Sequence, residues 1–194
     1  MTSFFRNPNR MEAFSDGVFA IAITLLILEI KVPQVGERGS PGALWQALLH
    51  LWPSYLAYLL AFSTILIAWI GHHILVGQVR QVTQRMLIVN GFFLLTVSFL
   101  PFPTAVVAEY LRSASGSAAA AFYALINLLN SLAFFLLVQT IIDAHPDSLA
   151  LLGRSRRDSF LGIFWCLACA GLALLSPVAS LLLVAGLFVW WLRP

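Results

Sequence analysis

Residues 10–30 read RMEAFSDGVFAIAITLLILEI, and this stretch decides the class of fold. Residues 11–30 supply about the 20 residues that an α-helix needs to cross a bilayer. Ser15 and Asp16 interrupt the apolar run soon after it begins, and no small-residue cleavage site follows it. Both features are untypical of a secretory signal peptide, so we expect a membrane helix.

The whole chain has the same apolar character. Of its 194 residues 60% are hydrophobic and 10% are charged, and the mean hydropathy is +0.90. Soluble domains carry roughly 25% charged residues. So little polar surface cannot cover a water-facing exterior, and we predict an all-α membrane protein with one transmembrane domain, residues 1–194. The net charge of +3 comes from scattered arginines that form no stripe, which argues against a nucleic-acid partner.

Six apolar stretches predict six transmembrane helices. They cover residues 11–30, 44–76, 86–111, 118–142, 159–175 and 178–192, and the last two also fit one continuous hairpin. The second stretch is too long for a hydrocarbon core of about 30 Å. It must therefore tilt, kink near Pro53 or project beyond the membrane.

The distribution of basic residues predicts the orientation. With the N-terminus inside, the cytoplasmic set is Arg6, Arg10, Arg80, Arg85, Arg154, Arg156, Arg157 and Arg193, and the outer set is Lys31, Arg38 and Arg112. Cytoplasmic connections carry the excess of Lys and Arg. We expect both termini on the cytoplasmic side of the plasma membrane.

The start of the first helix carries unusual polar groups. Asn9 is placed as its N-cap, with Glu12 in the capping-box position. Ser15 and Asp16 then fall in the second turn, where a carboxylate is costly unless it is paired or hydrated. Side chains from other stretches that are able to pair with them are Trp69, His72, His73 and Asn90.

Two readings of this polar cluster remain open. It either pins three helix ends together or takes a direct part in gating or proton sensing. His72 and His73 point about 100° apart on a helix, so we expect only one of them to join the cluster.

Farther along the first helix, spacings of three and four residues define one face. Its members are Gly17, Ala20, Ile21, Thr24, Leu25 and Leu28. Small residues allow helices to approach closely, so the spacing alone favours a packing face over a pore lining.

Other chemistry-bearing residues give no pattern of a catalytic or metal site. Cys166 and Cys169 are expected to be packing residues of an apolar helix. The histidines, at positions 50, 72, 73 and 145, have no metal-ligand spacing. We therefore expect neither a bound metal nor an enzyme.

The first helix also closely resembles the signature helix of the transmembrane protein 175 family of potassium channels. The family's RxxxFSD motif is matched by Arg10, Phe14, Ser15 and Asp16. The number of spans and the cluster of Trp69, His72 and His73 resemble the prokaryotic members, which carry the unit once.

The resemblance implies a homotetramer whose four first helices line a central pore. It implies that Ile21 forms the tightest ring, that Thr24 adds a polar layer one turn deeper, and that Leu25 and Leu28 also face the pore. The structural or gating network is then Arg10, Phe14, Ser15, Asp16, Trp69, His72, His73 and Asn90.

The function that we expect from this resemblance is a modestly selective potassium leak channel without a cofactor, in which potassium passes Ile21 and Thr24. No TVGYG-like loop of carbonyls is present, so selectivity would come from partial dehydration of the ion. The alternative is a proton- or substrate-coupled transporter that uses Asp16 and a histidine as a relay, which an internal repeat would favour.

Overall fold

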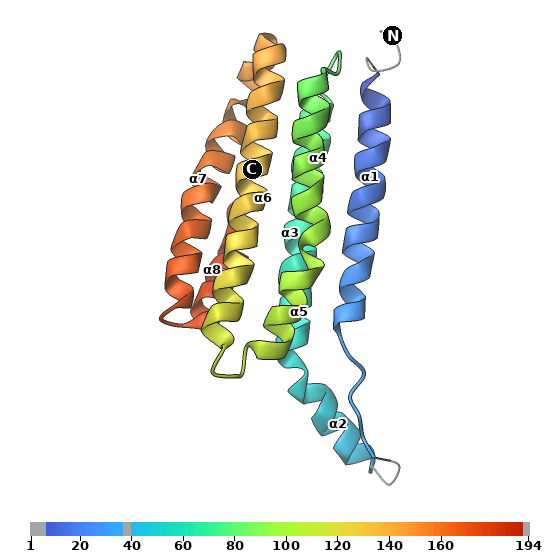
Figure 1. Cartoon of the computed structure of the whole chain (residues 1–194), viewed down its shortest axis with the longest axis vertical. Coiled ribbons are helices and arrows are strands. Elements are labelled where there is room, and N and C mark those ends of the chain that lie inside the picture. Colours follow the sequence, from blue (N-terminus) through green and yellow to red (C-terminus); the bar gives the residue numbers. More distant parts are fainter. Residues whose placement is uncertain (1–6, 37–39, 192–194) are drawn as a thin grey trace.

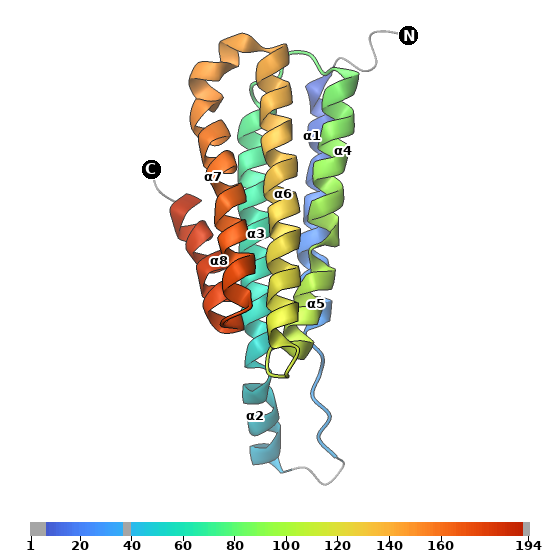
Figure 2. The same ribbon diagram turned by 60° about the vertical axis from the view of Figure 1, so that its left-hand side comes forward.

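The structure, a computed structural model, describes residues 7–36 and 40–191, and these residues form a helical bundle (Figures 1 and 2). Its helices are α1 (Pro8–Leu25), α2 (Pro41–His50), α3 (Trp52–Val76), α4 (Gln84–Phe99), α5 (Pro101–Tyr110), α6 (Gly116–Ala144), α7 (Leu149–Ala173) and α8 (Pro177–Trp191). Helix α1 lies on one side of the bundle, and α7 and α8 lie on the other. The chain is thus an all-α protein, as predicted.

Among the described residues, four segments are long and apolar enough to cross a membrane: Pro8–Glu29, Trp52–Val76, Gln84–Tyr110 and Gly116–Ala144. Helix α8 is apolar but shorter. Helix α7 carries three arginines and an aspartate in its first half, ahead of an apolar second half. These features agree with the predicted class of multi-pass membrane protein.

The second predicted stretch is divided into two helices by Pro53. Helix α2 ends at His50, α3 begins at Trp52, and Leu51 is the residue between them. A proline is tolerated only in the first turn of a helix because it lacks an N–H group. The break therefore falls just before Pro53, and α2 projects beyond the bundle at the end opposite the N-terminus (Figure 1).

The third predicted stretch is interrupted in the same way. Helix α4 ends at Phe99, and α5 begins at Pro101 and contains Pro103 in its first turn. Leu100 joins them with helical dihedral angles, and Thr104 N–H still donates to its carbonyl. The two helices therefore continue as one segment, Gln84–Tyr110.

The predicted N-cap of the first helix is wrong by two residues. Asn7, not Asn9, is the cap, and its side chain accepts a hydrogen bond from Asn9 N. Pro8 follows as the first helical residue, a position that suits proline because that N–H group has no partner there anyway. The helix also ends earlier than expected, since Leu26–Glu29 form a 3₁₀ turn.

Helix α7 begins ten residues before the apolar stretch predicted at residue 159. Its first half is polar, and apolar content alone does not mark the start of such a helix. The start of α1 lies at the same end of the bundle as the α3–α4 and α6–α7 connections. Most of the described arginines lie at this end. Arg6, Arg38 and Arg193 lie outside the described residues.

Two apolar cores hold the bundle together. One joins α1, α3, α4 and α6 around residues such as Phe93, and the other joins α3, α5, α6, α7 and α8 around Tyr123 and Leu181. Cys166 and Cys169 are free thiols, and both are buried, as expected for packing residues. The bundle positions α1 from one side only, because α1 packs against α3 and α4.

Candidate ion pathway and polar cluster

Helix α1 has one buried and one exposed face. The buried face is formed by Met11, Ser15, Phe19 and Ala22, which are at most 4% exposed and point toward α3 and α4. In its most apolar 18-residue window, only 28% of the residues are buried, compared with 44% in each of the other three candidate spans. Helix α1 therefore leaves more apolar surface uncovered than the rest of the bundle.

The exposed face carries the residues that the family resemblance implies at a pore. Ile21 and Leu28 are each 62% exposed, and Leu25 is 44% exposed. Phe14, at 65%, lies on the same side. Ile23, two residues from Ile21, instead packs against the core that joins α1 to its neighbours.

Thr24 also lies on the exposed face, and its hydroxyl bonds within the helix. Oγ1 lies 2.8 Å from the carbonyl oxygen of Ala20 and 3.0 Å from that of Ile21. The hydroxyl has a single hydrogen, which it donates to the backbone, so lone pairs of its oxygen remain available to another partner.

A buried chain of hydrogen bonds joins α1, α4 and α3. Asn90 Nδ2 donates to Ser15 Oγ at 3.0 Å, and Asn90 Oδ1 lies 2.9 Å from His72 Nε2, which must therefore carry the proton. Ser15 donates in turn to the carbonyl of Met11 at 2.8 Å. The three linked side chains are at most 2% exposed.

The His72 ring is otherwise enclosed by aromatic groups. It stacks on Phe93 at 6.1 Å between centroids, and Phe19 lies 5.5 Å away. Its Nδ1 is buried and has no hydrogen-bond partner among the described residues. The surroundings therefore suit a neutral imidazole.

A second chain runs along the more exposed edge of the same helices. Trp69 Nε1 donates to Asp16 Oδ1 at 2.9 Å, and the indole stacks on the His73 ring at 5.9 Å. His73 Nδ1 lies 3.3 Å from Glu12 Oε1. Glu12 thus faces α3 and not the cap of its own helix.

The polar side chains expected to form one cluster therefore form two separate chains of contacts. His72 belongs to the chain of Ser15, His73 belongs to the chain of Glu12, and Asn90 bonds to Ser15 instead of Asp16. Arg10 and Phe14 line a surface cavity of about 400 Å³ together with Asn90.

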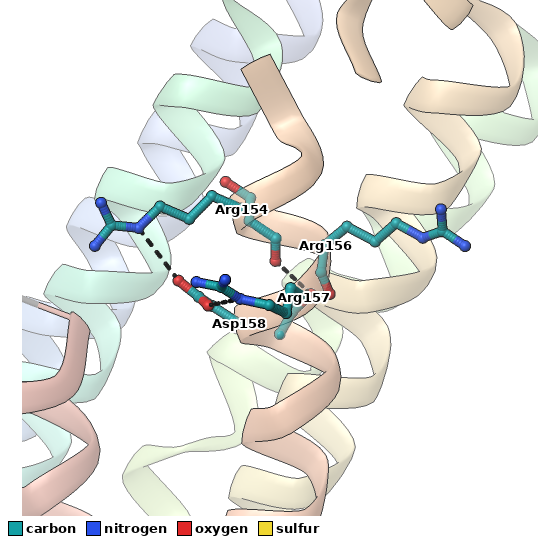
Figure 3. A network of polar contacts seen from close by, with 6 residues as sticks. Arg154, Arg156, Arg157 and Asp158 are labelled. Carbon is teal, nitrogen blue, oxygen red and sulfur yellow. Dashed lines mark hydrogen bonds and ion pairs between the residues drawn. The ribbon is translucent and has the colours of Figure 1, made fainter. Parts of the chain in front are cut away.

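Some polar contacts were not foreseen from the sequence. On α6, Asn130 Nδ2 donates to Thr96 Oγ1 at 3.0 Å, and Asn127 donates to the carbonyl of Tyr123 at 2.9 Å. Two asparagines three residues apart in an apolar span are the signal that points to such buried bonds. On α7, Asp158 pairs with two arginines (Figure 3).

The fold and these polar contacts define the class: an all-α, multi-pass membrane protein with a polar cluster at one end of its first helix and an uncovered apolar face below it. Residues 10–101 match the family described as endosomal/lysosomal potassium channel TMEM175. The chain is similar to a Chamaesiphon minutus structure described as a lysosomal potassium-selective channel TMEM175 homolog, with 38% identity, a TM-score of 0.85 and 95% of each chain covered. This chain belongs to the TMEM175 family.

Two curated relatives agree with this assignment. A potassium channel of Streptomyces collinus is 50% identical over 64% of this chain and 60% of its own length. The human endosomal/lysosomal proton channel TMEM175 is 45% identical over 49% of this chain and 20% of its own length. The chain thus matches about three fifths of the Streptomyces relative. The family is one of channels, which agrees with the expectation that the chain is not an enzyme.

Proposed function

We propose that this chain is a subunit of a potassium channel whose pore is lined by α1. The observation that carries the proposal is the exposed apolar face of α1, in a chain that resembles potassium channels of Streptomyces and Chamaesiphon. Ion flow through such a pore is passive. We place the protein in the plasma membrane, with its N-terminal end in the cytoplasm.

The proposed assembly is a homotetramer of subunits with six crossings. Helices α7 and α8 supply the fifth and sixth crossings. Four copies of the α1 face then meet at a central axis, where each covers the apolar side chains of its neighbours. Gly17 supports this close approach, since a Cβ added there would meet nothing within 4 Å in the single chain.

Ile21 forms the constriction in this proposal, and Leu25 and Leu28 continue the apolar lining. A ring of four isoleucines excludes water and makes an ion shed part of its hydration shell. Potassium holds its shell less tightly than sodium, so the ring passes potassium more readily. Only modest selectivity follows, because few polar groups compensate for the lost water.

Thr24 gives that compensation in part. Its hydroxyl hydrogen is committed to the backbone, so the oxygen presents its lone pairs to a cation on the axis. Four such oxygens one turn from Ile21 form a polar layer next to the apolar ring.

The buried chain of Ser15, Asn90 and His72 fixes the position of α1 against α4 and α3. A rotation or outward movement of α1 that widens the ring must also strain or break these bonds. These hydrogen bonds therefore have a structural role in every state of the protein. They also have a role in gating if the opening of the pore moves α1.

Flux in liposomes tests the proposed function. The purified full chain is reconstituted under a potassium gradient, and we expect potassium, rubidium and caesium to pass faster than sodium without a second gradient. A flux that saturates and requires a proton gradient would instead favour a coupled transporter. A proton current without potassium flux would instead favour a proton channel, which is how the human relative is described.

A further inference from the structure

A cleft opens on the side of the bundle away from α1. It has a volume of about 270 Å³ and lies between α3, α6, α7 and α8. Its walls include Leu59, Ile67, Leu187 and Phe188, which are apolar. Along α3 it extends from Leu56 to Ala68, which is roughly 18 Å at 1.5 Å per residue. The cleft is thus long, narrow and largely apolar.

Several of the polar side chains that line the cleft form hydrogen bonds within the protein. The amide nitrogens of Asn127 and Asn130 donate to Tyr123 and Thr96, and Ser159 Oγ donates to the carbonyl of Ser155 at 2.7 Å. These side chains therefore do not require a polar occupant, and an acyl chain fits these walls.

A charged turn of α7 borders the cleft at Asp158. Asp158 lines the cleft, and its side chain is only 11% exposed. Arg154 Nε lies 3.5 Å from Asp158 Oδ2, and Arg157 Nε lies 3.2 Å from Oδ1. One carboxylate that lines the cleft thus pairs with two guanidinium groups, whose side chains remain 54% and 68% exposed (Figure 3).

This turn lies where the polar first part of α7 gives way to its apolar second part. Arg154 and Arg157 lie roughly 8 and 12 Å along α7 from its start at Leu149. The apolar part of α7 begins immediately afterward, at Ser159. Arginines at the boundary of the hydrocarbon region meet phosphate groups, to which the planar guanidinium binds well.

We propose that this cleft binds one anionic phospholipid per chain. One of its two acyl chains lies between α3 and α8, and the phosphate contacts Arg154 and Arg157. The net positive charge of the turn selects an anionic headgroup. The site lies on the opposite side of the bundle from the proposed pore, so it adds to the proposed function without depending on it.

The site has a physical connection to α1. Ala68 lines the cleft, and the next residue, Trp69, bonds to Asp16 of α1. A bound lipid therefore packs against the helix that holds α1 in place.

Lipid binding to the purified full chain tests the proposal without any measurement of ion flux. Native mass spectrometry compares phosphatidylglycerol, phosphatidylcholine and a cationic lipid with identical acyl chains. We expect phosphatidylglycerol to bind roughly tenfold more tightly than phosphatidylcholine, because each arginine near a headgroup contributes to the affinity. Equal binding of the two, or preferred binding of the cationic lipid, would overturn the proposal.

Two variants with equal changes in charge locate the headgroup. The test variant combines Arg154→Gln, Arg157→Gln and Asp158→Asn, since the carboxylate would otherwise be left buried and unpaired. The control is Arg156→Gln, whose side chain points away from Asp158 (Figure 3). Each lowers the formal charge by one. The test variant should lose the preference for phosphatidylglycerol and the control should keep it; an equal loss in both would contradict the site.

A third variant and a wild-type measurement complete the test. Gly162 lines the cleft, and a Cβ there would meet only Ser131, at 3.6 Å. Gly162→Leu should therefore fill the cleft and weaken the binding of both lipids equally.

In the wild type, high salt should reduce the preference for the anionic lipid. A preference that is insensitive to salt would overturn the role of the arginines even if the triple variant does not fold.

Discussion

Asn90 of α4 donates a hydrogen bond from Nδ2 to Oγ of Ser15 on α1, at 3.0 Å, and both side chains are buried. Because the same amide also accepts from His72 at 2.9 Å, one residue connects three helices. On α1, Ser15 lies roughly 1.7 turns before Ile21, the proposed constriction. The orientation of the exposed Ile21 face therefore depends on a contact on the opposite, buried side of α1.

Replacing Asn90 by leucine should destabilise the protein. The change keeps the approximate size of the side chain but leaves the buried His72 N–H unpaired, at a cost of about 1–3 kcal/mol. Thermal unfolding in detergent measures this loss. The comparison is Trp69→Phe, which removes only the more exposed bond to Asp16 and keeps a ring next to His73. A larger loss in Trp69→Phe would show that the exposed chain is the more important one.

Replacing Ile21 by alanine should raise the leak of cations and lower the selectivity for potassium over sodium. The smaller side chain widens the apolar ring and lets water enter it. The matched control is Ile23→Ala, which removes the same atoms from a residue that packs on the core. Bilayer currents on both variants decide the matter. If Ile23→Ala changes permeation and Ile21→Ala does not, the pore is on another face of α1.

Replacing Thr24 by valine should reduce potassium conductance with little effect on stability. Valine has nearly the same shape but lacks the oxygen that faces the axis in the proposed pore. The lost hydroxyl bonded only to its own helix, so we expect a change in unfolding free energy within about 0.5 kcal/mol. Thr24→Ser keeps the oxygen and should restore conductance. A conductance equal to wild type in Thr24→Val would remove Thr24 from the pathway.

Replacing Gly71 by alanine should destabilise the contact between α3 and α6. An added Cβ would lie 2.8 Å from Cζ of Phe134, so the ring must move, at a cost of about 1–3 kcal/mol. At Gly91 of α4 the same Cβ would meet nothing within 4 Å, and alanine there should be neutral or stabilising. Unfolding temperatures of the two variants measure the difference, and equal temperatures would contradict the close packing at Gly71.

Much of the fold follows from the sequence because lipid imposes simple rules. Each predicted apolar stretch corresponds to one helix or to two consecutive helices in the described residues, and Pro53 marks a real break. The start of α7 is less predictable, since its first half is polar and is positioned by the α6–α7 connection. The cap of α1 is misplaced because Asn7 and Asn9 are equally good caps by residue type, and Pro8 between them decides which is used.

The candidate site was predictable in composition but not in connectivity. The sequence supplies the set of polar side chains near the start of α1, because each is costly in an apolar span. It does not say which pairs form, since that depends on the rotation of α3 and α4 about their axes. Those rotations place Asn90 opposite Ser15, and they turn His72 toward Asn90 and His73 toward Glu12.

In the proposed homotetramer, the one-sided packing of α1 links folding to assembly by mass action. A helix with 28% of its window buried depends more on partner subunits for its remaining burial than spans with 44% do. Anything that binds only the folded state shifts the unfolding equilibrium, and here the other copies of the chain are that ligand. The unfolding midpoint should therefore rise with the ratio of protein to detergent, and dilution in micelles alone should loosen α1 before the rest of the bundle.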